Sequence, residues 1–174
     1  NIAINKEGIK LRPFIEINST LFANNEIKPR IVITNNGKVR AINVLTQIIR
    51  RQFDGEKFVG ASWGSPDANK FDEIITFESK EIVLPERYIT EPDYNTIEFR
   101  LYYMRDYDKQ LYSYRTFYFY GSEGQEFKSW TNIQQAKLLK SYSGSKIIEE
   151  ALKLPKELFD DKTRMYVEDS LYEL

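Results

Sequence analysis

The segment from Ile31 to Thr46 constrains the fold most, because its residue pattern predicts a strand, a turn and a second strand. Ile31 and Ile33 occupy alternate positions, which is the period of a strand with one buried face. The Asn-Asn-Gly run at 35–37 contains residues that tolerate a positive φ, so it predicts the turn. A chain built on such a pair is expected to be rich in antiparallel β-structure.

The second strand of the pair, predicted over Ala41–Gln52, is apolar on both faces. The alternation places Ile42, Val44, Thr46 and Ile48 on one face and Asn43, Leu45, Gln47 and Ile49 on the other. An edge strand with one solvated face would show a cleaner separation of apolar and polar residues. The pattern therefore predicts a central position in the sheet.

Similar patterns predict five further strands. The full set is Leu11–Ile17, Ile27–Thr34, Ala41–Gln52, Phe71–Phe77, Glu81–Leu84, Thr96–Arg105 and Leu111–Tyr120. The last two are expected to form a hairpin, with Ile97 and Phe99 facing the core and Glu98 and Arg100 facing out. The stretch between Asp54 and Lys70 has little periodicity and predicts a long loop. Seven strands with turn signals between them fit a mainly β, two-sheet antiparallel sandwich.

The composition changes after Gly121. Helical spacing predicts one helix from Ser129, its expected N-cap, to about Lys140, and a second over Lys146–Leu154. The acidic stretch from Pro155 to Leu174 is compatible with one or two short helices. The expected organisation is a sandwich over 1–121 and a helical extension over 122–174 that packs on it.

The motif Asn-x-Gly-x-x-x-Ala-x-Asn-Val links the central strand pair to a known class of domain. Its residues here are Asn35 or Asn36, Gly37, Ala41, Asn43 and Val44. They resemble the second and third strands of bacterial immunoglobulin-like sandwiches such as the cell-adhesion-related domain. The resemblance covers about 25 of the 174 residues and implies an immunoglobulin-like fold. A weaker likeness, over Arg12–Ile17, is to bacterial membrane-anchored proteins of unknown function, and it implies an anchor upstream.

Two residue types are missing, and their absence excludes several chemistries. The chain has no cysteine and no histidine, so it has no thiolate nucleophile, no Ser-His-Asp triad and no imidazole metal site. We expect no cofactor. Lys and Arg are scattered along the predicted strands, whereas a nucleic-acid binder has a dense basic face, so we expect no nucleic-acid partner.

The strand Leu111–Tyr120 carries the candidate binding residues. Tyr112, Tyr114, Tyr118 and Tyr120 fall on one face. They could form an aromatic platform for a sugar, a peptide or a partner protein, because tyrosine is favoured at interfaces. Alternatively, these rings are packing residues covered by the C-terminal helices, or they stabilise the sheet by cross-strand pairing. Trp63, in a Gly/Ser-rich stretch, is either a lid packed on the sandwich or an exposed ligand-binding ring.

These observations favour a non-catalytic binding or structural module with a protein partner. The resemblances place it in the soluble part of a bacterial envelope or membrane-associated protein, with membrane contact only through a segment outside this chain. The alternative is a carbohydrate-binding domain or a carboxylate-based glycosidase, since 26 acidic residues could supply a catalytic pair. A third possibility is a scaffold that docks through its helical tail.

Overall fold

The computed structural model describes residues 12–22, 26–54, 57–62, 68–90, 93–121, 126–129 and 165–169. Within these ranges the chain forms ten strands and one short helix. In chain order they are β1 (Ile15–Thr20), β2 (Arg30–Asn35), β3 (Ala41–Asp54), β4 (Lys57–Ser62), β5 (Ala68–Ile74), β6 (Ser79–Val83), α2 (Arg87–Thr90), β7 (Thr96–Arg105), β8 (Leu111–Gly121), β9 (Glu126–Ser129) and β10 (Met165–Asp169).

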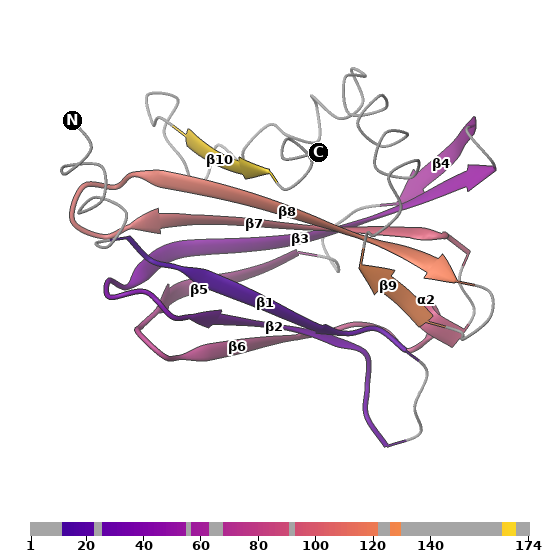
Figure 1. The fold of residues 1–174 in the computed structure, drawn as a ribbon, viewed down its shortest axis with the longest axis horizontal. Coiled ribbons are helices and arrows are strands. Elements are labelled where there is room, and N and C mark those ends of the chain that lie inside the picture. The colour runs from indigo at the N-terminus through magenta and orange to yellow at the C-terminus, as the bar shows by residue number, and fades with distance from the viewer. Residues whose placement is uncertain are drawn as a thin grey trace.

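The strands form two sheets, which confirms a mainly β, two-sheet arrangement (Figure 1). The small sheet has the order β1-β2-β6, and the large sheet has the order β10-β8-β7-β3-β4, with β5 also on β3 and β9 also on β8. Every pairing is antiparallel except that of β10 with β8. The strand β3 lies between β7 on one side and β5 and β4 on the other, so its predicted central position is correct.

The main core lies between the two sheets. Ile31 and Ile33 of β2 and Ile82 of β6 pack in the same cluster as residues of the large sheet. The large sheet contributes Val44, Ile48, Ile97, Phe99, Leu101 and Tyr103, among others. Full burial of one such side chain contributes about 1.5–3 kcal/mol. The alternating apolar residues that predicted the strands thus hold the two layers together.

A β-bulge in β3 places Ile42 on the face of the sheet opposite to the predicted one. The register of β3 against β7 shifts between Ile42 and Leu45, and Asn43 there has a φ of 49°. Asparagine tolerates this left-handed conformation better than most residues do. Because of the extra residue, Ile42 packs with Leu45 on the outer face of the large sheet, while Val44 faces the inner core. The prediction that Ile42 and Val44 share a face is therefore wrong.

The stretch predicted as a long loop between Asp54 and Lys70 also needs correction. It contains β4 and the first residues of β5, which pair with opposite halves of the long strand β3. Their sequence lacks clear alternation, but an adjacent strand supplies backbone hydrogen bonds whatever the side chains are. The residues that the structure describes in this stretch are therefore mostly strand.

The predicted helical extension over 122–174 is described only at 126–129 and 165–169, and both segments are strands on β8. Ser129, the expected helix N-cap, is the last residue of β9, and β10 lies in the acidic stretch where short helices were expected. The remainder of both predicted helices lies outside the described residues. The edge of β8 thus accepts strands from a segment whose composition indicated helix.

Candidate functional site

The four predicted tyrosines share one face of β8, and that face looks into the inter-sheet core. Tyr112 and Tyr118 are only 6% and 4% exposed, and the ring of Tyr112 stacks on Tyr103 with centroids 5.3 Å apart. Tyr114 and Tyr120 are partly buried against the same cluster. The positions of Tyr112 and Tyr118 fit the packing interpretation. Trp63, the fifth candidate, lies outside the described residues.

A different surface gathers exposed aromatic rings, and a buried asparagine organises it. Asn35, at the end of β2, has no solvent exposure. Its side-chain oxygen accepts hydrogen bonds from the backbone N–H of Phe14, at 3.2 Å, and of Gly37, at 2.9 Å. Its amide nitrogen donates to the carbonyls of Val39, at 2.9 Å, and Ile74, at 3.0 Å. All four hydrogen-bonding positions of the Asn35 side chain are thus used.

The backbone around Asn35 adds further links. Its N–H donates to the carbonyl of Glu78 at 3.1 Å, and its carbonyl accepts from the N–H of Phe77 at 2.6 Å. The N–H of Asn36 donates to the carbonyl of Phe14 at 2.8 Å. These bonds join three segments that are distant in sequence, namely residues 12–14, 36–40 and 75–78. They form one end of the sandwich, together with the β7–β8 turn at 106–110 (Figure 1).

Gly37 holds the first two of these segments together for a reason other than the predicted one. None of Asn35, Asn36 and Gly37 has its backbone in the left-handed region. Instead, a Cβ on Gly37 would lie 2.5 Å from Arg12 O and Phe14 N. The glycine allows the backbone at 12–14 to pass close to the β2–β3 turn.

Replacing this glycine tests the close approach. Because a Cβ there collides with backbone, we expect Gly37→Ala to lower the free energy of unfolding by about 1–3 kcal/mol. Gly121→Ala is the matched control, since a Cβ at Gly121 meets nothing within 4 Å. Urea denaturation of both variants gives the comparison. Equal stabilities would contradict the packing of residues 12–14 against Gly37.

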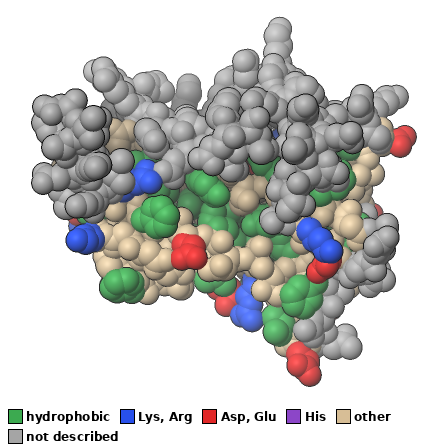
Figure 2. All heavy atoms as spheres, viewed as in Figure 1, with side chains coloured by type: hydrophobic (Ala, Val, Ile, Leu, Met, Phe, Trp, Pro, Cys, Tyr) green, Lys and Arg blue, Asp and Glu red, His purple; other side chains and the backbone are tan. Residues whose placement is uncertain are grey.

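Three aromatic rings stand exposed at this end of the sandwich, and we call the surface the aromatic end. Phe14 is 51% exposed, Phe77 78% and Tyr107 60%. Two guanidinium groups lie among the rings: that of Arg12 is 5.9 Å from the centroid of Phe14, and that of Arg105 is 4.6 Å from that of Tyr107. Figure 2 shows hydrophobic and basic side chains side by side at this end, left in the view. Cations at such distances are attracted to ring faces.

Ion pairs tie the β7–β8 turn to the rest of the aromatic end. The guanidinium of Arg40 bonds Asp106 and Glu73, each at 2.7 Å, and so connects the β7–β8 turn to β5. The hydrogen bond from Arg40 holds the pKa of Asp106 below its usual value. Asp108 is paired in turn with Arg105 at 2.6 Å. Within the described residues, no group of three or more acidic side chains could hold a metal ion.

The backbone of Phe77 is unusual for so large a side chain. Its φ is 66°, in the left-handed region, where bulky residues are rare and pay a steric cost. Its ring nevertheless lies largely in solvent and contributes little to the core. Folding alone favours glycine or asparagine at this position. Conformational cost without a matching packing gain is typical of residues kept for function.

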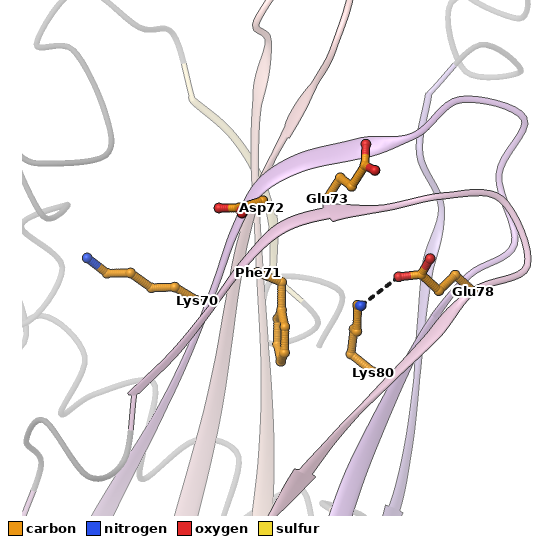
Figure 3. Close-up of a pocket in the computed structure, with 6 residues that line it drawn as sticks. All are labelled: Lys70, Phe71, Asp72, Glu73, Glu78 and Lys80. Carbon is orange, nitrogen blue, oxygen red and sulfur yellow. Dashed lines mark ion pairs between the residues drawn. The ribbon is translucent and has the colours of Figure 1, made fainter.

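A groove of about 430 Å³ opens beside the aromatic end, between β5 and β6 (Figure 3). Its lining residues are Lys70, Phe71, Asp72, Glu73, Glu78 and Lys80. Glu78 pairs with Lys80 at 2.8 Å, and Glu73 pairs with Arg40. The Lys80 amine also lies 5.9 Å from the centroid of Phe71. The groove is therefore a charged channel with one aromatic ring.

The outer face of the large sheet holds a third feature, a buried charge cluster. Glu98 and Arg100 of β7 point away from the inter-sheet core, as predicted, but they are fully buried. The carboxylate of Glu98 bonds Arg51 at 3.0 Å, Arg115 at 2.9 Å, and Arg100. Period-two alternation could not reveal this burial, because charged residues on an outward face are usually solvated.

The cluster shifts the pKa values of its members. Burial by itself raises the pKa of Glu98, but the charges of Arg100, Arg51 and Arg115 outweigh burial and lower it to about 2. Burial also lowers the pKa of the Arg51 guanidinium, against the opposing attraction of Glu98. The cluster therefore keeps Glu98 ionised in the dry interior. We read it as structural, because its carboxylate is turned to arginines and has no exposure.

Comparison with known proteins gives no guide to function. No protein-family model matches the chain, and no curated protein sequence matches it. Among the described residues, no helix has the length and hydropathy needed to cross a membrane. The aromatic end and the adjoining groove are therefore the candidate site on structural grounds alone.

Proposed function

We propose that this chain is a non-catalytic module that binds a partner protein through its aromatic end. The observation that carries the proposal is Phe77, an exposed ring held at a costly backbone angle. Phe14 and Tyr107 are exposed at the same end of the sandwich, and Arg12 and Arg105 lie beside them. Aromatic residues and arginine are enriched in protein interfaces and dominate their hot spots.

The fold we propose for this module is immunoglobulin-like. In that fold, strands A, B and E form one sheet and G, F and C the other. The orders β1-β2-β6 and β8-β7-β3 correspond to these, with β4 as an additional strand beside C. The strand β5 departs from the constant-type pattern, because it pairs with β3. Loops clustered at one end of such a sandwich commonly carry its binding residues.

The proposed setting is a bacterial envelope, with the domain as the soluble part of a membrane-associated protein. The support is the resemblance of residues 12–17 to anchored bacterial proteins and of the motif from Asn35 to Val44 to adhesion-related bacterial domains. Contact with the membrane would then come from a segment outside this chain. We propose no nucleic-acid partner and no cofactor.

Phe77→Gly tests the binding function. Because glycine relieves the backbone strain, we expect stability to remain within about 1 kcal/mol of the parent or to rise. Loss of the ring should weaken capture of the partner at least tenfold. The measurement is chemical cross-linking in the source cells: the tagged full-length protein is purified, and the amount of the partner protein cross-linked to it is compared between the variant and the parent. Val59→Ala is the control, since Val59 is 61% exposed on β4, away from the aromatic end.

Two results would contradict the proposal. One is that Phe77→Gly and Val59→Ala cross-link the same proteins in the same amounts as the parent. The other is that Phe77→Gly lowers the melting temperature strongly, which would make the ring a folding residue. Subcellular fractionation of the same cells tests the envelope setting separately.

The groove between β5 and β6 offers a second candidate, a carbohydrate-binding site. Phe71 could stack on a sugar, and the three carboxylates of the groove could bind hydroxyl groups. Catalysis is less well supported, because a glycosidase needs one carboxyl group that stays protonated, whereas Glu73 and Glu78 are paired with cations. Binding on a glycan array that Asp72→Asn abolishes would favour this candidate.

A further inference from the structure

Both walls of the groove are edges of sheets. Among the strands that the structure describes, β5 bonds only to β3 and β6 bonds only to β2. The turn at 75–78 joins the two strands, and Figure 3 shows them diverging from it. The groove lies in the opening between them. An edge strand presents backbone N–H and C=O groups that can pair with another chain.

The hydrogen bonds to β2 show which residues of β6 present these groups. The carbonyl of Glu78 accepts from Asn35, and the N–H of Leu84 donates to Pro29. Backbone groups alternate in direction along an antiparallel strand. Lys80 and Ile82 therefore bond towards β2, in register with Ile33 and Ile31. The residues that point their N–H and C=O groups to the open edge are Ser79, Glu81 and Val83, all of which are exposed.

We propose that the groove binds an extended segment of a partner protein, which adds as a strand to the open edge of β6. This inference rests on the proposed function, because it needs a protein partner, and it names how that partner is held. In strand addition the main chain supplies affinity, and alternate side chains supply specificity. The groove adjoins the aromatic end through Glu78 and Phe77 of the connecting turn, so one partner can contact both.

The residues that line the groove favour an extended segment of another protein over other ligands. Five of its six lining residues are charged, so it does not suit an apolar small molecule. The side chain of Asp72 makes no ion pair or hydrogen bond within the described part of the chain, and a basic side chain on the added strand would pair with it. A second copy of this chain fits poorly. If β6 of two copies paired antiparallel through Ser79, Glu81 and Val83, about a twofold axis, Glu81 of one copy would lie opposite Glu81 of the other. Like charges directly opposite each other are destabilising.

A proline at Glu81 tests the inference. Proline removes an N–H that points to the open edge and that β2 does not use, which edge strands tolerate. The probe is a display library of random peptides of about ten residues, which is long enough for one strand. Peptides are selected from it for binding to the full chain. We expect selected peptides to carry a basic residue and to bind Glu81→Pro at least tenfold more weakly than the parent. Glu81→Ala, which loses the ion pair with Arg30 but keeps the N–H, should bind within threefold of the parent.

Amide hydrogen exchange on the unmodified protein provides the second measurement. A saturating selected peptide should slow exchange at Ser79, Glu81 and Val83 and leave Lys80 and Ile82, which bond towards β2, unchanged. The inference is overturned if no peptide is enriched, if folded Glu81→Pro binds as well as Glu81→Ala, or if the three outward amides are not slowed. Phe77→Gly probes the aromatic end separately, so a failure of strand addition is distinguished from a failure of binding through the aromatic end.

Discussion

Glu98→Gln should lower the free energy of unfolding by about 3–5 kcal/mol, the usual cost of removing one partner from a buried ion pair. The carboxylate has no exposure and is the group on which Arg51, Arg100 and Arg115 converge. Glutamine has nearly the same shape as glutamate but carries no charge. The three buried guanidinium groups then repel one another, because no anion lies between them. Urea denaturation at neutral pH measures the loss.

Glu81→Gln is the matched control for this prediction. Glu81 also pairs with an arginine, Arg30, at 3.2 Å, but both side chains are more than a third exposed. An exposed pair contributes about 0–1 kcal/mol, so the control should change little. Similar losses in the two variants would mean that the cluster around Glu98 is solvated, and would contradict its burial.

The dependence of stability on pH gives an independent check of the same cluster. The pKa of Glu98 falls from 4.5 to about 2 on folding. A lowered carboxyl pKa contributes stability that is fully present above the unfolded value and is lost as the pH falls to the folded value. The stability difference between the parent and Glu98→Gln should therefore shrink by about 3 kcal/mol between pH 5 and pH 2. A difference that stays constant over this range would exclude the lowered pKa.

Asn35→Ala is expected to produce the second large effect. The substitution leaves the buried carbonyl groups of Val39 and Ile74 and the N–H groups of Phe14 and Gly37 without their side-chain partner. Each unsatisfied buried group costs about 1–3 kcal/mol, and partial relaxation brings the expected total to about 3–5 kcal/mol. Urea denaturation, monitored by tryptophan and tyrosine fluorescence, measures this loss of stability.

The neighbouring asparagine supplies the control. Asn36 is exposed, and within the described residues its side chain bonds only the exposed carboxylate of Glu16. Asn36→Ala should therefore cost less than about 1 kcal/mol. Asn35→Ala should also raise hydrogen exchange at Phe77, whose N–H bonds the Asn35 carbonyl, because the loops of the aromatic end lose their common anchor. Equal effects of the two substitutions would contradict the anchoring role of Asn35.

A stable anchor matters for the proposed function. A protein that presents aromatic rings on loops loses less conformational entropy on binding when those loops are already held in place. Asn35, Gly37 and Arg40 hold the loops by buried hydrogen bonds, close backbone packing and ion pairs respectively. Asn35→Ala is therefore expected to weaken partner capture as well as stability, whereas Phe77→Gly should weaken capture alone.

Local sequence patterns were sufficient for the strands and for their approximate order. The alternation over Thr96–Arg105 and Leu111–Tyr120 predicted β7 and β8 nearly to the residue, and the turn between them closed the expected hairpin. The doubly apolar pattern of β3 correctly placed it in the middle of its sheet. These features are local, because a strand's period and its turn residues depend on neighbours a few positions away.

The tertiary structure alone decided which faces are covered and which residues meet. Alternation placed Tyr112 and Tyr118 on one face without saying that the small sheet covers it, and placed Glu98 outward without revealing its three buried partners. The aromatic end joins segments that lie between 20 and 66 positions apart, as in the Asn36–Glu16 and Arg40–Asp106 contacts. Such contacts depend on how the sheets pack and on the register of distant strands, and no local period carries that information.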